Sequence, residues 1–278
     1  LRIVISMNKL SVYGATGFIG GTFCDLYPDE VIKIPREERK PQSKDIFYLI
    51  STTTNHHVFD DLHKDVDTNL TVLMDVLEHC KEEDLTFNFV STAFVYGNDI
   101  INAKEDDPCD PGGFYSITKR CAEKLLISYC QTFDIKYRIM RIANVYGDDK
   151  TVSAKKNVLK FLIGLMAEDK DLLLYDDGMQ LRDYMHVSDI CRAMKLVMEK
   201  GEINSIYNIA AGNPLPFKII MEKAREYLGS NSKFNYAETP TFNKIAQAYN
   251  YSVNVDKLKG LGFQPEINFE EGLKSLCS

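Results

Sequence analysis

The apolar positions along the chain predict an alternation of short strands and amphipathic helices. Short apolar runs bounded by polar or glycine-rich segments are typical of strands buried in a parallel sheet. Runs of this kind occupy residues 10–13, 31–34, 46–50, 87–90, 137–142 and 206–209. Because helical patterns separate these strands, we expect a doubly wound α/β domain built on a parallel sheet.

The same pattern predicts the helices of this domain. Val66, Leu70, Leu73 and Leu77 recur at helical spacing, which indicates an amphipathic helix whose apolar stripe faces the core or a subunit interface. A second helix is expected after Pro111, with its apolar side formed by Cys121, Ala122, Leu125, Leu126 and Tyr129. A third helix is marked by Ile190, Ala193, Met194 and Val197.

The alternation loosens after about residue 150. A helix is expected at 158–166, a strand at 172–175 and a further helix at 217–228. We therefore divide the chain into a first domain at 1–150 and a smaller C-terminal α/β lobe at 151–278. A segment at about 184–210 is expected to return to the first domain.

Composition narrows the class of protein without indicating a function. The 278 residues carry 33 Lys and Arg against 40 Asp and Glu, a formal net charge of −7, so nucleic acid and anionic membranes are not expected partners. No apolar run reaches the length of a membrane span, and no secretory signal is visible. The seven scattered cysteines include no Cys-x-x-Cys pair, which favours reduced thiols in a soluble, cytoplasmic protein.

A glycine-rich turn follows the first predicted strand. The segment Gly14-Ala15-Thr16-Gly17-Phe18-Ile19-Gly20 leads into a helix, and a strand that turns through glycines into a helix is the arrangement that binds dinucleotides. The glycines permit a tight turn and close backbone approach, and the helix N-terminus holds the pyrophosphate. The Gly-x-x-Gly-x-x-Gly spacing also fits an ordinary turn before a helix, but its place directly after the first strand favours the cofactor.

The second predicted strand ends without the acidic residue that holds the ribose of NAD. Pro35, Arg36, Glu37, Glu38, Arg39 and Lys40 follow it instead. Arg36 could pair with a 2′-phosphate, which would favour NADP. The alternative is a solvated loop of mixed charge.

Two histidines and an aspartate suggest a possible metal site. His56, Asp60 and His63 would share one face only if this segment were helical. No further cluster of ligand residues accompanies them. We therefore predict a polar turn here and no metal.

Tyr115 and Lys119 provide the candidate chemistry. Four residues apart on a predicted helix, they project from the same face. An ammonium beside a phenol favours the phenolate and lowers the phenol pKa from about 10, which would make Tyr115 usable as an acid or base. Thr92 follows the 87–90 strand, where a hydroxyl can bind a substrate oxygen. Alternatively, Tyr115 only packs against the core, Lys119 is solvated and Thr92 caps the following turn.

With these pieces in order, the chain resembles the extended short-chain dehydrogenase/reductase superfamily, in its nucleotide-sugar epimerase/dehydratase branch. The resemblance runs from about Leu10 to the C-terminus. It implies a Rossmann-type fold, with an NAD(P)-binding domain at 1–150 and a mainly substrate-binding lobe at 151–278. The motifs that carry the resemblance are residues 14–20, Ser91-Thr92-Ala93-Phe94-Val95-Tyr96-Gly97, Tyr115-x-x-x-Lys119, residues 141–147, residues 182–189 and Tyr207-Asn208-Ile209-Ala210.

The resemblance also implies a role for each site residue. Tyr115 would move a proton on or off a sugar hydroxyl, Lys119 would hold the ribose and lower the Tyr115 pKa, and Thr92 would orient the reacting oxygen. Asn144 would contact the sugar nucleotide, and Arg182 its phosphates or ribose. Residues implied to bind NAD or NADP are Gly14, Thr16, Gly17, Phe18, Ile19, Gly20, Arg36, Ser51, Tyr115 and Lys119. Helices matching 66–80 and 114–131 pack across a two-fold axis in related enzymes, so a homodimer is expected.

The chain departs from the family in three places. Between the second strand and Asp45 the family usually carries another strand and helix, which are nearly absent here, so the adenine side of the cofactor site is reduced. The 4,6-dehydratases carry Asp-Glu where this chain has Ala93 and Phe94, which argues against water elimination. No Arg follows Tyr236, so phosphate binding must rely on Arg182 or other groups.

These inferences predict an NAD(P)-dependent nucleotide-sugar epimerase that transfers hydride at a sugar carbon, expected to be C4, with Tyr115 as acid and base. An NADPH-dependent nucleotide-sugar keto-reductase is one alternative, because Arg36 and the reduced adenine region favour a cofactor that exchanges at each turnover. A non-catalytic nucleotide-binding or regulatory protein on the same fold is another. Against it, a chain relieved of catalysis has no physical reason to keep Thr92, Tyr115 and Lys119 in register.

Overall fold

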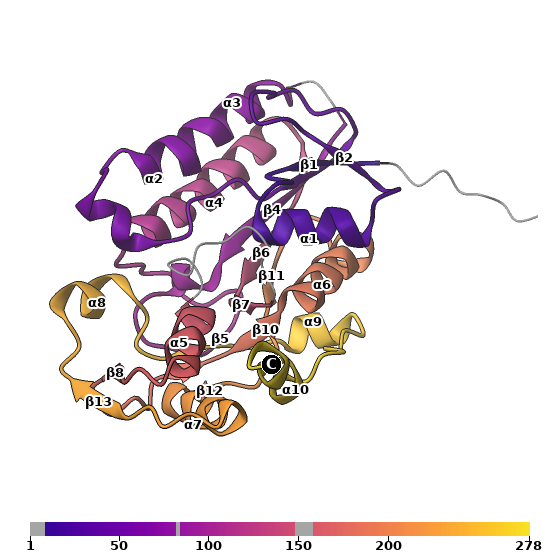
Figure 1. The fold of residues 1–278 in the computed structure, drawn as a ribbon. Helices are drawn as coiled ribbons and strands as arrows, with labels where there is room; N and C mark the ends of the chain where they lie inside the picture. Colours follow the sequence, from indigo (N-terminus) through magenta and orange to yellow (C-terminus); the bar gives the residue numbers. More distant parts are fainter. Residues whose placement is uncertain (1–8, 82–83, 148–157) are drawn as a thin grey trace, which may run out of the picture.

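A parallel six-stranded sheet forms the centre of the computed structural model, which describes residues 9–81, 84–147 and 158–278. The strands run in the order β11-β6-β4-β3-β1-β2 (Figure 1), and all neighbouring pairs are parallel. The predicted doubly wound α/β fold is therefore confirmed. The strands are β1 (Leu10–Tyr13), β2 (Val31–Lys33), β3 (Asp45–Tyr48), β4 (Thr86–Thr92), β6 (Lys136–Ile142) and β11 (Ser205–Ile209).

Helices cover both faces of this sheet, which is why its strands are almost continuously apolar. In β1, Val12 points to the face covered by α1 (Phe18–Leu26) and α6 (Val187–Lys200). The next residue, Tyr13, points to the face covered by α3 (Val72–Glu78) and α4 (Phe114–Thr132). In Figure 1, α3 and α4 lie on one side of the strands, and α1 and α6 lie on the other.

The strand order reverses between β1 and β3. From β1 the chain passes to β2 on one side and then to β3 on the other, so the carboxyl ends of β1 and β3 flank the crevice where open α/β sheets bind ligands. β2 is the edge strand, and residues 34–44 return to β3 without a further helix or strand. The predicted reduction of this region is confirmed.

The helix predicted at 66–80 is divided into α2 (Lys64–Val66), a π-helical turn η2 (Asp67–Thr71) and α3. Leu73 and Leu77 are buried, whereas Val66 is 42% exposed. A π turn adds a residue to one helical turn, so the regular spacing does not keep Val66 on the buried face. The prediction of one continuous apolar stripe is wrong at this end.

α4 buries a different stripe from the predicted one. Ala122 and Leu126 are buried, but Cys121 is exposed and Leu125 is 41% exposed. Lys119 and Glu123 occupy the inner face instead. Apolar residues lie on both sides of this helix, so the pattern alone does not select the buried side.

The C-terminal lobe is built from short strands that pair over long sequence distances. β14 (Tyr251–Val253) lies between β9 (Leu181–Arg182) and β5 (Ile100–Ala103), and β12 (Leu215–Pro216) pairs with β9. This pairing brings the end of the chain beside the segment that follows Thr92. Two-stranded sheets join β7 (Asn144–Tyr146) to β10 (Tyr184–His186) and β8 (Leu172–Tyr175) to β13 (Phe234–Ala237). The helices are α5 (Val158–Ala167), α7 (Phe217–Leu228), α8 (Thr241–Ala246), α9 (Asp256–Gly260) and α10 (Phe269–Leu276).

The predicted domain boundary near residue 150 falls within 148–157, outside the described residues. β11 lies in the segment expected to return to the first domain, and it is an edge strand of the six-stranded sheet. The division into a cofactor domain and a substrate lobe stays a prediction. Among the helices of the described residues, none is long and apolar enough to cross a membrane.

Candidate active site

The glycine-rich turn joins β1 to α1 at the crevice between β1 and β3. Gly14 has a φ of +81°, and a Cβ at Gly20 would collide with the Gly14 carbonyl oxygen. Gly14 therefore permits the turn, and Gly20 permits the close approach of α1. Gly17 is the N-cap of α1 and has no capping side chain, and the first turn carries no acidic residue. The N–H groups of that turn thus fit the pyrophosphate of a dinucleotide.

The predicted contact of Arg36 with a 2′-phosphate stays a prediction. Arg36 is exposed in the loop that follows β2. Its carbonyl oxygen accepts a hydrogen bond from the Arg39 guanidinium at 2.6 Å. The loop is fixed to the sheet by Tyr13, whose hydroxyl donates to the Arg39 carbonyl oxygen at 2.7 Å.

Three predicted site residues meet at the carboxyl ends of β3 and β4. Thr92 ends β4, Ser51 follows β3, and Tyr115 lies in the first turn of α4. Burial is the largest influence on Tyr115 and raises the pKa of its phenol to about 12, although hydrogen bonds with Thr92 and Ser51 act to lower it. The structure therefore brings together three residues that the sequence analysis assigned to the site separately, and their roles stay a prediction.

Lys119 does not lower the Tyr115 pKa as predicted. Its Nζ donates to the Val90 carbonyl oxygen at 2.7 Å and lies 4.1 Å from the centre of the Phe89 ring. Lys119 is 2% exposed, and burial lowers its own pKa to about 7. An ammonium with so low a pKa is not a permanent positive charge near pH 7, so the predicted effect on Tyr115 is wrong in this arrangement.

Tyr251 is a site residue that the sequence analysis missed. It is 1% exposed, its hydroxyl donates to the Ile142 carbonyl oxygen at 3.2 Å, and a hydrogen bond joins it to Thr92. The Phe94 ring packs on it with 4.6 Å between centroids, and Ala93 is fully buried. The dehydratase acid and base positions are thus filled by packing residues. No local motif marks Tyr251, because only the pairing of β14 with β5 brings it here.

A buried polar network holds the Ser51 hydroxyl. Asn69, in the π turn, accepts hydrogen bonds from the Ser51 hydroxyl at 3.1 Å and from the Thr52 N–H at 2.9 Å. The Thr52 hydroxyl donates to Asp65, which is 1% exposed and lies 3.3 Å from Nδ1 of His57. The sequence offered no sign of Asn69 or Asp65 beyond their position between two predicted elements.

Two histidines of the 55–63 segment contact other side chains. His56 packs against Phe242, with ring centroids 5.1 Å apart, and His57 contacts Asp65. Part of the segment is a short 3-10 turn, η1 (Asn55–Phe59). No group of three or more His, Cys, Asp or Glu that could hold a metal ion was found in the part of the chain that the structure describes.

Asn144 and Arg182 are polar groups with unused bonding capacity. The Asn144 Nδ2 atom is buried and finds no acceptor among the described residues. The Arg182 guanidinium donates to the carbonyl oxygens of Leu181 at 2.7 Å and Tyr249 at 2.6 Å. Burial lowers its pKa, and no carboxylate of the described residues forms an ion pair with it. An unsatisfied buried polar group costs about 1–3 kcal/mol, which a ligand acceptor would offset.

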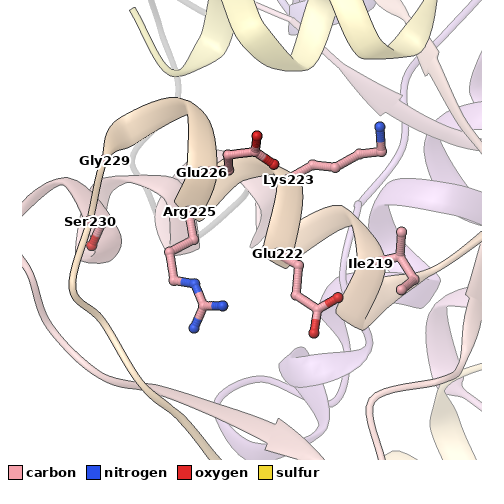
Figure 2. A pocket seen from close by; sticks show the side chains of 7 residues that line it. All are labelled: Ile219, Glu222, Lys223, Arg225, Glu226, Gly229 and Ser230. Atoms are coloured by element: carbon pink, nitrogen blue, oxygen red, sulfur yellow. The ribbon is translucent and has the colours of Figure 1, made fainter.

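A separate surface hollow lies along α7 (Figure 2). In that view, the Arg225 and Lys223 side chains extend in different directions. Lys223 forms an ion pair with Glu270 at 2.9 Å. The residues that line the hollow are Ile219, Glu222, Lys223, Arg225, Glu226, Gly229 and Ser230. None belongs to the Tyr115 cluster, so the hollow is not the candidate active site.

The sequence matches one family model and resembles several known proteins. The model of the "NAD dependent epimerase/dehydratase family" matches residues 50–210. The low-salt glycan biosynthesis protein Agl12 of Haloferax volcanii is 33% identical over 214 residues, which cover 76% of this chain and 66% of that protein. A dTDP-glucose 4,6-dehydratase of Haemophilus influenzae is 29% identical over 210 residues, which cover 71% of this chain and 61% of that protein.

Solved structures share the fold over almost the whole chain. A UDP-glucuronic acid 4-epimerase of Bacillus cereus, in complex with UDP-glucuronic acid and NAD, has a TM-score of 0.84 at 22% identity and covers 97% of this chain and 98% of its own. RMD of Pseudomonas aeruginosa, complexed with NADPH, has a TM-score of 0.83 at 19% identity and covers 97% of both chains. Proteins of this fold thus bind NAD or NADPH, as the glycine-rich turn indicates here.

Proposed function

Because this chain belongs to the NAD-dependent epimerase/dehydratase family, we propose that it epimerises a nucleoside diphosphate sugar at one carbon, C4, with NAD or NADP as cofactor. When bound, the cofactor supplies hydride acceptance and return at its nicotinamide carbon. The observation that carries this proposal is the meeting of Thr92, Ser51 and Tyr115 hydroxyls at the sheet edge that also bears the glycine-rich turn.

Tyr115 is the group that moves the proton. With a pKa of about 12 the phenol is protonated near pH 7, so it is ready to give a proton to a keto oxygen. To act as a base it must lose that proton, and the hydrogen bonding with Thr92 and Ser51, which acts to lower the Tyr115 pKa, favours the resulting phenolate. Thr92 also orients the reacting oxygen, and Lys119 binds the ribose.

Asn144 and Arg182 hold the sugar nucleotide. Arg182 offers a guanidinium without a carboxylate partner among the described residues, and such a group suits a diphosphate. Asn144 offers an unused amide donor. Ala93 and Phe94 supply no acid or base, which supports epimerisation over water elimination.

The substitution Tyr115→Phe tests the assignment of the acid/base. Turnover of UDP-glucose to its C4 epimer, followed by chromatography, is expected to fall by about a hundredfold or more, with UDP-glucose still bound in calorimetry. Tyr137→Phe is the matched control: Tyr137 is buried and lies at the start of β6, at the opposite end of the sheet from this cluster. Unchanged turnover in the Tyr115 variant would refute the assignment.

A keto-reductase is the second candidate, favoured by the reduced adenine region and the basic loop at Arg36. An epimerase keeps its NAD through two opposite half-reactions, whereas a reductase exchanges NADPH at each turnover. To distinguish the epimerase from the reductase, the purified protein is denatured and any nicotinamide cofactor released is identified by mass spectrometry. Near-stoichiometric NAD supports the epimerase, and an empty protein that binds NADPH supports the reductase. Cofactor binding in calorimetry without turnover across a panel of nucleotide sugars would support the non-catalytic alternative.

We also propose a homodimer through α4 and the α2–α3 segment, which lie together in Figure 1. Ile117, Cys121 and Leu125 are exposed at helical spacing on α4, and Met74 of α3 is 46% exposed. Such a stripe is typical of a face that a partner covers. Leu125→Glu is expected to yield a monomer in light scattering. Leu173→Glu, on an exposed apolar residue of β8, is expected to keep the dimer.

A further inference from the structure

We propose that Asn55 is a positioning residue that ties the catalytic Tyr115 to the C-terminal lobe. Its side-chain amide joins the first turn of α4 to the last turn of α8, so that the lobe sets the position of Tyr115 when a sugar nucleotide binds. The inference rests on the function proposed above. It deepens that function by identifying how substrate binding and proton transfer are coupled.

The α4 side of this link begins with a missing cap. The N-cap of α4 is Gly113, which has no side chain, so the N–H of Tyr115 would lack the capping partner that helices use. Asn55 Oδ1 accepts a hydrogen bond from this N–H at 3.0 Å, although the two residues are 60 positions apart. A Cβ at Gly113 would collide with that oxygen. The glycine therefore admits Asn55 as the cap of α4.

The α8 side of the link uses the other half of the same amide. Asn55 Nδ2 donates to the carbonyl oxygen of Ala246 at 2.6 Å, and Asn98 Nδ2 donates to that of Ile245 at 2.8 Å. The last carbonyl groups of a helix have no partner within it. The two asparagines therefore provide the C-terminal cap of α8, and both come from the first half of the chain.

Asparagine is the residue type that this position needs. Asn55 is 7% exposed, and its amide can accept through Oδ1 and donate through Nδ2 at once. The neighbouring η1 residues add apolar contacts to α8, because the rings of His56 and Phe59 pack against Phe242 with centroids 5.1 and 4.7 Å apart. η1 thus holds α8 and the start of α4 together.

The same segment reaches the candidate phosphate ligand. The Arg182 guanidinium donates to the Tyr249 carbonyl oxygen, and the Tyr249 N–H donates to the Asn98 carbonyl oxygen at 2.5 Å. A diphosphate that engages Arg182 therefore acts on the segment that Asn55 and Asn98 cap. A displacement of about 1 Å at a reacting group can cost about a hundredfold in rate, so this link is sufficient to couple binding to catalysis.

Two aspartate variants test the proposal. Asn55→Asp keeps an acceptor for the Tyr115 N–H but places a carboxylate oxygen against the Ala246 carbonyl oxygen. Only the hydrogen bond to α8 is therefore lost. Asn98→Asp makes the same chemical change at the same end of α8 and leaves the Asn55 link intact. With UDP-glucose as the probe, we expect Asn98→Asp to raise KM several-fold with kcat within about twofold of wild type. Asn55→Asp is expected to raise KM and also lower kcat by about tenfold or more.

A residue that only caps α4 gives a different result. A carboxylate is a good cap at a helix N-terminus, so a merely structural Asn55 predicts unchanged kcat in Asn55→Asp. Unchanged kcat, or an equal loss of kcat in both variants, would overturn the proposal. Thermal unfolding of each variant confirms that the measured protein is folded.

Amide hydrogen exchange at Tyr115 tests the link without turnover. Phe242→Ala loosens α8, and we expect it to speed exchange of the Tyr115 N–H several-fold in the wild-type background but not in Asn55→Asp. An equal change in both backgrounds would refute the coupling. If UDP-glucose neither binds nor reacts, the proposed substrate is wrong, whereas the exchange comparison still decides the role of Asn55.

Discussion

Arg141 of β6 and Lys119 of α4 are both buried cations, but among the described residues only Arg141 forms an ion pair with a carboxylate. Arg141 is 1% exposed and donates two hydrogen bonds, at 3.0 and 2.9 Å, to the carboxylate of Glu123. Burial acts to lower its pKa, but the hydrogen bonds with Glu123 raise it on balance. Lys119 is 2% exposed and has a carbonyl oxygen and a ring face as partners. Burial therefore prevails there and lowers its pKa to about 7.

The difference separates a buried cation with a carboxylate partner from one that, under the proposed function, binds a ligand. A buried ion with a complete set of partners is neutralised within the protein, whereas an incomplete set leaves a desolvation cost. Arg182 belongs with Lys119, because its pKa is lowered and no ion pair with a described carboxylate compensates for its burial. The two cations that the proposed function assigns to ligands are thus buried without a paired carboxylate among the described residues.

The largest expected effect comes from breaking the paired site. Glu123→Gln leaves Arg141 buried without its carboxylate, and we expect the free energy of unfolding to fall by about 3–5 kcal/mol. Urea denaturation measures this change. Glu226→Gln, on an exposed residue of α7, is the control and is expected to change stability by about 0.5 kcal/mol at most. A similar small change in the Glu123 variant would contradict the comparison.

Removing the unpaired cation should have the opposite sign. Lys119→Met is expected to raise the free energy of unfolding at pH 7 by about 1–4 kcal/mol, the range seen when buried charges give way to apolar groups, while cofactor-dependent turnover is lost. A destabilised variant would show that the ammonium contributes to the fold.

The pH dependence sharpens the same prediction. The folded pKa of Lys119 is about 7, below the ordinary value of 10.5, so the unfolded chain binds more protons between these two values. Wild-type stability from this residue therefore rises with pH across that window. Chemical denaturation from pH 7 upward should show part of this slope missing in Lys119→Met. An identical slope in both proteins would argue against the lowered pKa.

Arg182 is expected to give the smallest effect on the fold and a clear effect on binding. A hydrogen bond to a charged group contributes about 1.5–3 kcal/mol, so Arg182→Gln should weaken UDP-glucose binding by about 10- to 100-fold in calorimetry. Stability should stay within about 1 kcal/mol of wild type. Arg225→Gln, at the α7 hollow, should bind as wild type does. Equal affinities in all three proteins would remove Arg182 from the substrate site.

The fold and the hydroxyl cluster were largely predictable because they depend on local patterns. The β1 strand, the Gly14 turn and the start of α1 follow one another within 20 residues, and their hydrophobic and glycine spacing determines what they form. The spacing of Tyr115 and Lys119 likewise follows from helical geometry alone. The carboxyl ends of parallel strands meet at one edge, which is why Thr92 was expected at the ligand-binding edge of the sheet.

The sequence by itself determined most of the strands and helices, and it predicted Tyr115, with Lys119 beside it, as the acid/base. Only the tertiary structure decided the pKa values of Tyr115 and Lys119. Burial sets the pKa of Lys119 near 7 and that of Tyr115 near 12, and desolvation depends on everything packed around a group. Tyr251 and Asn55 were invisible for a related reason: the bond from Asn55 to Ala246 spans 191 positions, and no local period encodes a contact at that separation.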